Sequence, residues 1–351
     1  MPTEVEMMEA LKKVIDPELG RSIVDLKMVR NLQIDADGVV SFTLALTVPG
    51  CPMKDRMQRD AHAMLTALPG IRDVKVTFGA MTEEERKELF GHSSNGLPKL
   101  NDFSRIGQTI AVMSGKGGVG KSLVTAALAV HLARQGKKVG ILDADLTGPS
   151  IPKLFGLPPG GVRGSEMGIL PANTRMGIRV MSTNLLVPEE DTAIVWRGPV
   201  VTGTIRQFYE QVLWGRLDVM LIDLPPGTSD ANLTVIQNLP LNGAVLVTTP
   251  QALAALVVRK GVRMLQELKV PILGIVENMS YYICPDSGKQ HEVFGPSHAA
   301  EVAQLAGTEI AARLPIRPEI AEQCDAGQVE AVSIPELEAF SRQLVSVPAA
   351  T

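Results

Sequence analysis

The segment from residue 115 to residue 122 constrains the fold of this chain more than any other feature. It reads Gly-Lys-Gly-Gly-Val-Gly-Lys-Ser and matches the phosphate-loop pattern G-x-x-x-x-G-K-[ST]. An apolar run at 109–114 precedes it, and a helical pattern at 121–135 follows it. Because a phosphate loop joins a strand to a helix, the sequence predicts an α/β fold with a nucleotide site at this loop.

Strands and helices alternate along the chain from residue 106 onward. The predicted strands are apolar throughout, which is typical of a parallel sheet covered by helices on both faces. We therefore predict a doubly wound, mostly parallel sheet of the P-loop NTPase type for residues 106–351. The predicted strands lie at 109–114, 138–143, 178–182, 217–222, 244–248 and 272–276, and the predicted helices at 121–135, 201–213, 230–239, 252–268 and 297–305.

The first 82 residues predict a separate, small α+β domain. Asp37-Gly38 is a typical hairpin turn between two strand-like segments, and Pro69-Gly70 ends a helical pattern. A charge run followed by Ser, Asn, Gly and Pro residues at 83–105 is typical of a linker, because such a segment buries little. The predicted elements of the small domain are a helix at 6–14, strands at 32–34 and 39–48, a helix at 53–68 and a strand at 74–78.

Composition and charge argue against several classes of function. A net charge of −4 and an aromatic content of 4% do not suit a protein that binds nucleic acid by bulk charge or base stacking. Three cysteines are too few and too scattered for a disulfide framework and fit a reducing compartment. The N-terminus has no secretory signal pattern, and no apolar run reaches the length of a membrane span. We expect a cytoplasmic protein without nucleic-acid or membrane partners.

The residue types in the phosphate loop predict how it holds ATP and Mg²⁺. Glycines let backbone N–H groups converge on phosphate oxygens without a Cβ atom in the way, and the helix N-terminus favours negative charge. Lys121 is expected to reach the β- and γ-phosphates as a catalytic residue, and the Ser122 hydroxyl to ligate Mg²⁺. The predicted nucleotide contacts in the loop are Gly115, Lys116, Gly117, Gly118, Val119, Gly120, Lys121 and Ser122.

Two acidic segments follow predicted strands and should face the same ligand crevice. Asp143 ends the strand at 138–143, Asp145 lies two residues later, and Asp223 follows the strand at 217–222. Asp223 fits the residue that holds Mg²⁺, while Asp143 would support either the metal or the loop. Gly227 can bring its N–H group to the γ-phosphate as a switch. The alternative for each aspartate is a helix or turn cap, which is common for this residue type.

The lysine directly after the first glycine of the loop is unusual, and the form Gly-Lys-Gly-Gly-Val-Gly-Lys-Ser resembles the deviant P-loop of the MinD/ParA/nitrogenase-iron-protein class. The resemblance implies that Lys116 crosses a homodimer interface to contact the partner's nucleotide. It also implies that Asp145 orients the attacking water and that Asn278 recognises adenine. From the residues alone, Lys116 is also compatible with a solvated lysine near phosphate, and Asn278 with a turn cap.

Several motifs together resemble the Mrp/ApbC family of iron–sulfur cluster carrier ATPases over residues 106–334. The resemblance implies an ATPase that binds iron–sulfur clusters and transfers them to apoproteins, in the company of assembly factors. The N-terminal domain resembles the small iron–sulfur assembly domain often fused to such proteins, through segments 16–18 and 47–52. The carrier motifs are the deviant P-loop, DADLTGPSIP at 143–152, WRGP at 196–199, DLPPGTSD at 223–230 and ENMSY at 277–281.

The expected cluster motif departs from that family. Mrp proteins usually carry C-P-x-C after the Asn-Met-Ser segment, whereas this chain reads Cys284-Pro-Asp-Ser287. A symmetric dimer would then supply two thiolates in place of four, and serine is a poorer ligand because its hydroxyl deprotonates at far higher pH. Three alternatives stay open: Cys284 and its symmetry mate hold a labile cluster with other ligands, this variant carries clusters differently, or it carries none.

Cys51 is a second candidate for cluster handling, at the junction of a predicted strand and a predicted helix. The helix dipole at such a position lowers the pKa of a thiol and favours the thiolate. The alternative is a small buried apolar residue, which is the commoner role of an isolated cysteine. The resemblance to the assembly domain favours the functional role.

Two other functions share the phosphate loop. A positioning or partitioning ATPase of the MinD/ParA type needs a membrane-binding tail or a basic DNA-binding surface. The predicted C-terminal helix is followed by a tail without basic residues, which argues against a membrane anchor. A nitrogenase-like reductase would use ATP to gate electron transfer, and the missing cysteine pair counts against it. The sequence therefore favours the carrier function, with the positioning ATPase as the alternative.

Overall fold

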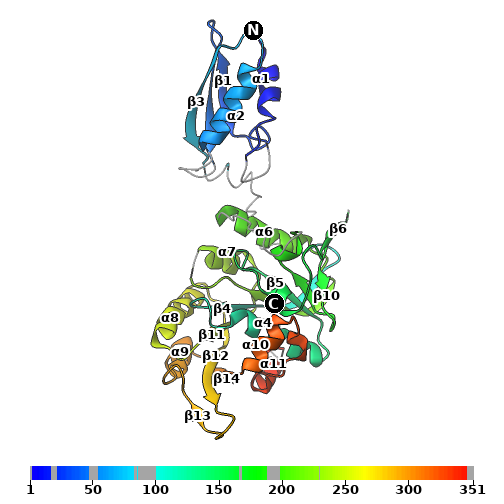
Figure 1. Ribbon diagram of the computed structural model, residues 1–351, viewed down its shortest axis with the longest axis vertical. Coiled ribbons are helices and arrows are strands. Elements are labelled where there is room, and N and C mark those ends of the chain that lie inside the picture. The colour runs from blue at the N-terminus through cyan, green and yellow to red at the C-terminus, as the bar shows by residue number, and fades with distance from the viewer. Residues whose placement is uncertain are drawn as a thin grey trace. The chain divides into compact units, whose positions relative to one another are not determined.

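The chain divides into two compact units, Met1–Asn95 and Gly96–Thr351 (Figure 1). This computed structural model describes residues 2–16, 22–46, 54–82, 85, 100–165, 168–187, 198–228 and 230–345. Most of the predicted linker at 83–105 lies outside the described residues, so the domain boundaries at 82 and 105 stay predictions. Each unit has a hydrophobic core of its own.

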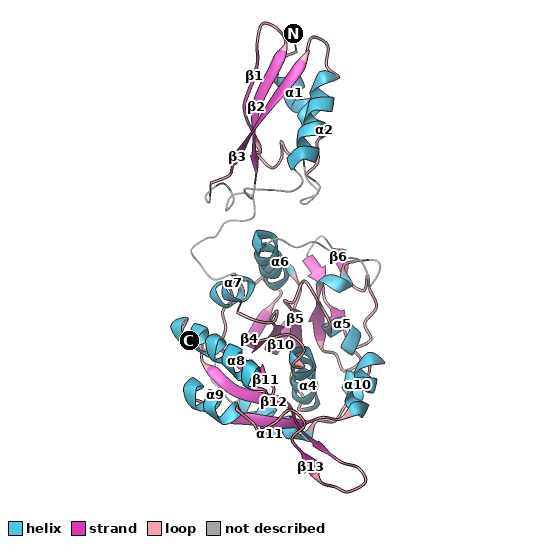
Figure 2. Cartoon of the chain, turned by 60° about the vertical axis from the view of Figure 1, so that its left-hand side comes forward, coloured by secondary structure: helices cyan, strands magenta, loops and turns pink. Residues whose placement is uncertain are grey.

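The N-terminal unit packs helices against one face of a sheet whose described strands are β1 (Val29–Ile34), β2 (Val39–Leu46) and β3 (Asp73–Ala80) (Figure 2). β1 and β2 pair antiparallel, as predicted for a hairpin, and β2 pairs parallel with β3 after the crossover through α2 (Lys54–Thr66). In the core of this unit, alternate residues of β2 pack against the buried side of α2. The largest members of this core include Leu11, Phe42, Leu44, Met57 and Leu65.

The first helix differs from its prediction at both ends. The sequence predicts 6–14, whereas α1 runs from Glu4 to Leu11. The Thr3 hydroxyl accepts a hydrogen bond from the Glu6 N–H, and the Glu6 carboxylate accepts one from the Thr3 N–H at 2.8 Å. This capping box fixes the start of the helix two residues before the apolar pattern indicates it.

The second unit contains a mostly parallel sheet with helices on both faces, which confirms the predicted doubly wound fold (Figure 1). Within the described residues its strand order is β13-β12-β11-β4-β10-β5-β9-β8, with β14 pairing β12. The neighbours of the central strand β4 are both parallel to it. The strands are β4 (Arg105–Ser114), β5 (Val139–Asp143), β8 (Ala172–Asn173), β9 (Arg179–Met181), β10 (Arg216–Asp223), β11 (Gly243–Thr248), β12 (Ile272–Ile283), β13 (Gln290–His291) and β14 (Ile310–Pro315).

The central strands bury side chains on both faces, which is why their sequences are apolar without alternation. On β4, Ile110 and Val112 belong to one core, while Ala111 and Met113 belong to the core on the other face. No helix in the described part of the chain is both long and apolar enough to cross a bilayer. The described helices of this unit are α4 (Lys121–Arg134), α5 (Ile151–Leu154), α6 (Gly198–Gln211), α7 (Asp230–Asn238), α8 (Ala252–Glu267), α9 (Ala299–Ala306), α10 (Pro318–Asp325) and α11 (Glu338–Leu344). Two short strands, β6 (Arg163–Ser165) and β7 (Gly168–Leu170), pair antiparallel outside the main sheet.

Two features at the β12 edge of the sheet were not predicted. β12 continues through polar residues to Ile283, well past the predicted end at 276, and β14 was not predicted at all. The carboxylate of Glu277 is buried in β12 because the Arg313 side chain of β14 donates to it at 3.0 Å. Burial of a polar residue that depends on a partner far along the chain leaves no apolar pattern in the local sequence.

Candidate functional site

The phosphate loop connects β4 to α4 at the edge of the sheet where the parallel strands β5 and β10 also end. Gly118 and Gly120 have φ angles of 77° and 82°, in the left-handed region that favours glycine. A Cβ atom at Gly120 would lie 2.2 Å from Asn278 Nδ2, so a larger residue does not fit there. The loop lines a cavity of about 310 Å³. Its amides can therefore surround a phosphate group in that cavity.

Three side chains from the start of α4 converge on the carboxylate of Asp223 at the end of β10. Lys121 Nζ lies 2.6 Å from Asp223 Oδ2, and the Ser122 hydroxyl donates to the same oxygen at 2.6 Å. The Thr125 hydroxyl donates to Asp223 Oδ1 at 2.6 Å. Lys121 is 6% exposed and Asp223 is fully buried. These contacts satisfy both oxygens of a buried carboxylate and hold the start of α4 against the end of β10.

The oxygens of Ser122 and Asp223 fit a Mg²⁺ ion. Mg²⁺ prefers oxygen ligands and is usually held by one or two side chains together with the phosphates of its substrate. The two side-chain oxygens lie 2.6 Å apart at the base of an amide-lined loop, which offers that donor set. When bound, the ion would offset the negative charge of the phosphates, as the dipole and free N–H groups of the first turn of α4 also do.

Asp143 lies beside Asp223 and is already engaged by the protein. The two residues are paired in register on adjacent parallel strands, and Asp143 is fully buried. Burial raises the pKa of Asp143 well above its ordinary value, and the neighbouring Asp223 carboxylate raises it further. Its oxygens accept hydrogen bonds from the Ser182 hydroxyl at 3.0 Å and from the Asp145 and Ile151 N–H groups. Of the two predicted roles, this geometry favours support of the loop over a metal contact.

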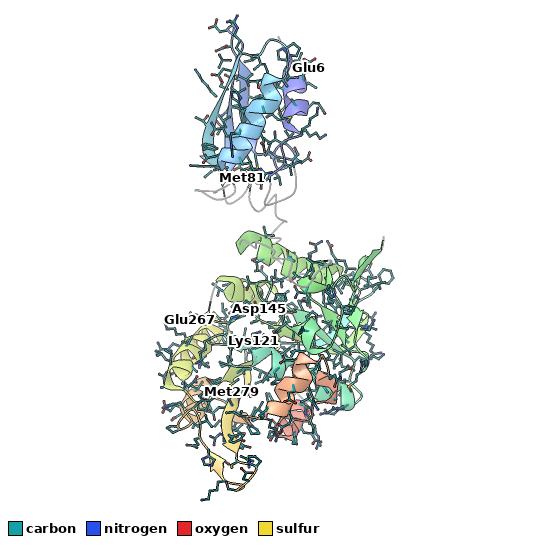
Figure 3. All side chains as sticks on the ribbon, viewed as in Figure 1. Glu6, Met81, Lys121, Asp145, Glu267 and Met279 are labelled. Carbon is teal, nitrogen blue, oxygen red and sulfur yellow. The ribbon has the colours of Figure 1, made fainter. Side chains whose placement is uncertain are left out.

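Asp145 lines the cavity together with the phosphate loop. Figure 3 labels Asp145 and Lys121 in this unit. One carboxylate oxygen of Asp145 accepts hydrogen bonds from the Thr147 hydroxyl at 3.0 Å and the Gly148 N–H at 3.2 Å. This turn fixes the carboxylate at the cavity wall, partly exposed. A carboxylate held in that place is able to orient a water molecule.

Lys116 has an intramolecular partner in this structure. Its ammonium group donates to Gln251 Oε1 at 2.7 Å, and the Thr249 hydroxyl donates to the same oxygen at 3.0 Å. Gln251 immediately precedes α8, so the contact joins the phosphate loop to that helix. Because the partner is a neutral amide, it competes weakly with a phosphate for the ammonium group. The predicted contact with a second subunit stays a prediction.

Gly227 and Asn278, both predicted to contact the nucleotide, are hydrogen-bonded to backbone carbonyls of the protein. The Gly227 N–H donates to the Ser114 carbonyl at 2.9 Å, so it reaches a γ-phosphate only after that bond breaks. The Asn278 amide donates to the Val119 carbonyl at 2.9 Å and is 5% exposed. Asn278 does not line the cavity and instead supports the phosphate loop from behind. Its predicted contact with adenine requires an exchange of that hydrogen bond and stays a prediction.

Cys284 follows the last residue of β12, in the loop that leads to β13. The Cys284 N–H donates to the Lys289 carbonyl at 3.0 Å, and the Gly288 N–H donates to the Cys284 carbonyl at 2.8 Å. The Ser287 hydroxyl and the backbone N–H groups of Ser287 and Asp286 donate hydrogen bonds to the Cys284 sulfur. These hydrogen bonds favour the thiolate and so lower the pKa of Cys284. No cluster of three or more potential metal ligands occurs among the described residues, so Cys284 is not part of such a set there.

Of the other two cysteines, the structure describes Cys324 but not Cys51. Cys51 and the WRGP segment at 196–199 lie wholly or largely outside the described residues, and the cluster-handling role of Cys51 stays a prediction. Cys324 on α10 is buried, and burial raises the pKa of its thiol. Its thiol is therefore a packing group in the core.

Sequence reasoning missed three residues that touch this site: Thr125, Asn232 and Gln251. Thr125 lies four residues after Lys121 on the same helix, so helical spacing was a usable signal for it. Asn232 donates to the carbonyls of the loop after Asp223. The contacts of Asn232 and Gln251 cross between elements, and no local pattern indicates them.

Comparisons with known proteins identify the family of each unit. The family model described as NUBPL iron-transfer P-loop NTPase matches residues 105–347, and a model described as iron-sulfur cluster assembly protein matches residues 4–78. A Synechocystis protein named iron-sulfur cluster carrier protein is 40% identical over 96% of this chain and 93% of its own length. A chloroplastic Fe-S cluster assembly factor of Arabidopsis thaliana is 41% identical over 95% of this chain and 60% of its own length.

A solved structure shares the ATPase-like unit. A nucleotide-binding protein from Archaeoglobus fulgidus, in complex with ADP, is 50% identical to this chain. The match has a TM-score of 0.61 and covers 67% of this chain and 92% of that protein. The resemblance seen in the motifs is thereby confirmed at the level of sequence and fold. The chain belongs to the family of NUBPL iron-transfer P-loop NTPases and carries an N-terminal domain of the iron–sulfur cluster assembly type.

Proposed function

We propose that this protein is an ATP-hydrolysing carrier that binds iron–sulfur clusters and transfers them to apoproteins in the cytoplasm. One observation carries the ATPase part of the proposal: Lys121 and Ser122 converge on the buried Asp223 at the base of the phosphate loop. The cargo part is supported by Cys284, whose loop favours the thiolate, and by the relatives named as cluster carriers. The same relatives favour a carrier over a positioning ATPase.

The residues around the cavity supply the roles that hydrolysis requires. The loop amides from Gly115 to Ser122 bind the phosphates, and Ser122 and Asp223 hold Mg²⁺. Asp145 orients a water molecule whose oxygen attacks the γ-phosphorus, and the bond from that phosphorus to the bridging oxygen of ADP breaks. ADP and inorganic phosphate leave, and the proton of the water passes to the phosphate. Lys121 stabilises the charge that develops on the phosphoryl oxygens.

The active form in this proposal is a homodimer that meets at the nucleotide sites. Lys116 leaves the neutral amide of Gln251 and contacts the nucleotide of the partner subunit, which makes dimerisation depend on ATP. Cys284 of each subunit then supplies one thiolate to a shared cluster, whose remaining ligands come from outside this pair. Such a cluster is labile, which suits a cargo that must be released to an acceptor protein. Cys51 is the second thiol proposed to handle the cargo.

Anaerobic reconstitution tests the proposal most directly. The full chain is incubated with iron and sulfide, bound iron is quantified, and transfer to an apo-ferredoxin is followed with and without Mg-ATP. We expect transferable iron in the wild type, less in Cys284→Ala, and a smaller loss in Cys51→Ala. A wild type that binds Mg-ATP but holds no transferable iron would end the carrier proposal and leave the ATPase. ATP-dependent pelleting with vesicles or DNA would favour a positioning ATPase.

A further inference from the structure

The loop between β10 and α7 is held by hydrogen bonds from two sides, to Ser114 and to Asn232. It contains Pro225, Pro226 and Gly227, and the Gly227 N–H donates to the Ser114 carbonyl at 2.9 Å. On the other side, Asn232 Nδ2 donates to the Pro225 carbonyl at 3.0 Å and to the Gly227 carbonyl at 2.5 Å. Asn232 lies on α7 and is completely buried. One side-chain amide therefore holds two carbonyls of the loop that follows Asp223.

The two carbonyls that Asn232 holds flank one peptide group. The Pro225 carbonyl belongs to the peptide before Pro226, and the Gly227 carbonyl to the peptide after Gly227. The peptide between them, from Pro226 to Gly227, carries the N–H that bonds Ser114. Proline restricts φ at both preceding positions, whereas Gly227 has a φ of 90° and is free to change. The Pro226–Gly227 peptide is thus the place where this loop can rotate.

Space around Gly227 permits such a rotation. A Cβ atom built there would have its nearest neighbour, the Gly115 carbonyl oxygen, at 3.9 Å. That neighbour belongs to the start of the phosphate loop, and apart from the residues next to Gly227 in the chain it is the one described atom within 4 Å of that position. Pro226, which shares that peptide, lines the cavity with the phosphate loop, so a Gly227 N–H turned away from Ser114 and toward the cavity would find a bound phosphate oxygen as a strong acceptor.

The Asn232 side chain is not arranged for stability alone. Its Oδ1 atom is buried and has no hydrogen-bond partner among the described residues. A buried acceptor without a partner is destabilising relative to a paired one, because nothing offsets the loss of its hydrogen bonds to water. An apolar side chain of similar size would avoid that cost, so the amide is retained for the two hydrogen bonds that its nitrogen donates.

We infer that Asn232 is a positioning residue that braces the loop after Asp223, so that the γ-phosphate of ATP is sensed by one peptide, Pro226–Gly227. This inference rests on the proposed function, because it assigns a role in ATP hydrolysis. With both flanking carbonyls fixed, capture of the Gly227 N–H by the γ-phosphate requires only the loss of its bond to Ser114. Without the brace, the whole loop must be ordered each time ATP binds, which weakens ATP binding but not ADP binding.

The experiment compares Asn232→Leu with the matched variant Asn101→Leu. Asn101 Nδ2 also donates to two backbone carbonyls, of Glu210 at 2.9 Å and Val212 at 2.8 Å, but away from the phosphate loop. Calorimetry of the full chain with Mg-ADP and with a non-hydrolysable ATP analogue gives the preference for the triphosphate. We expect Asn232→Leu to lower that preference about tenfold, the effect of one hydrogen bond to a charged group, with ADP affinity within about twofold of wild type. Asn101→Leu should keep the wild-type preference.

Turnover separates positioning from a general loss of structure. In Asn232→Leu we expect kcat to fall with a melting temperature no lower than that of Asn101→Leu. Asn232→Ala, which also lacks a side-chain donor and is smaller, replaces the leucine variant if the latter does not fold. A wild-type preference for the triphosphate in both Asn232 variants overturns the inference and leaves the proposed function intact. A wild type that binds neither nucleotide overturns both.

Discussion

At the base of the phosphate loop Lys121 and Asp223 are buried and paired, whereas at the Cys284 loop most side chains are exposed. Lys121 and Asp223 are almost inaccessible to solvent, and both oxygens of the Asp223 carboxylate have protein donors. The loop after β12 is exposed from 285 to 292, and Cys284 itself is half-buried. The donors to its thiol come from its own turn, at Asp286 and Ser287. One site is built from several elements of the fold and the other from a single short segment.

β12 joins the two sites and is itself firmly held up to the start of the exposed loop. The buried carboxylate of Glu277 accepts hydrogen bonds from Ser280 at 2.5 Å, Ser297 at 2.6 Å and Arg313 at 3.0 Å. Preorganised electrostatics at the nucleotide site require burial, and exchange of cargo with another protein requires exposure. Substitutions at the first site should therefore cost both stability and activity, whereas those at the second should change chemistry with little effect on the fold.

Lys121→Ala should have the largest effect. It removes the ammonium group expected to stabilise the transferring phosphoryl group, so we expect ATP turnover to fall by at least about 100-fold. It also leaves the buried Asp223 without its cation, which should lower the free energy of unfolding by about 3 kcal/mol. Phosphate release and urea denaturation measure the two effects. Lys138→Ala, which removes an exposed lysine, is the control. Equal turnover in Lys121→Ala and Lys138→Ala would contradict the catalytic role given to the buried Lys121.

Lys116→Ala should have a smaller and more selective effect. Lys116 is held by the neutral Gln251 amide and not by a buried carboxylate, so its loss should leave stability nearly unchanged. We expect turnover to fall about tenfold while the Kd for Mg-ATP rises no more than about threefold, because the lysine is proposed to act on the partner's nucleotide. Lys260→Ala on the exposed side of α8 is the control. Unchanged turnover in Lys116→Ala would remove the case for a contact across the dimer.

The sequence predicted the features of this molecule that depend on adjacent residues. The glycines, lysines and serine of the phosphate loop are contiguous, and apolar runs without alternation mark strands that are buried on both faces, such as β4 and β10. Asp223 was predicted to lie near Ser122 because the carboxyl ends of parallel strands meet at one edge, and the structure brings the two together. The doubly wound fold is confirmed, while the catalytic roles of these residues stay predictions.

The sequence did not predict contacts that depend on the tertiary arrangement. The Asn278 amide supports the phosphate loop at Val119 because β12 and the loop come together only in the folded sheet. Asn232 and Gln251 are ordinary polar residues in sequence and acquire roles through backbone or side-chain groups far along the chain. The length of β12 was underestimated because Glu277 is buried by pairing and not by apolar character.

Ser287→Ala tests how the exposed loop controls the Cys284 thiol, and the measurement is the pH dependence of Cys284 alkylation. The Ser287 hydroxyl is the largest cause of the lowered pKa of Cys284, so its removal should raise that pKa. A higher pKa leaves less thiolate at any pH below it, and we expect the alkylation rate at pH 7 to fall about threefold. Mass spectrometry with iodoacetamide distinguishes Cys284 from Cys51 and Cys324. Ser333→Ala should keep the wild-type pH profile, and the same profile in Ser287→Ala would contradict the assignment of the hydroxyl as the donor.

Ser287→Cys should sharpen the comparison with the smallest change to the fold. The Ser287 side chain already reaches the Cys284 thiol, so a cysteine there places a second sulfur beside the first. A symmetric dimer would then offer four thiolates in place of two, and we expect the iron retained after anaerobic reconstitution and desalting to rise about twofold per protomer. The double variant Cys284→Ala with Ser287→Cys keeps the number of thiols of the wild type and should show no such gain. If wild type and Ser287→Cys retain equal iron, thiol count at this loop does not limit cluster binding, and the exposed loop is not the ligand site.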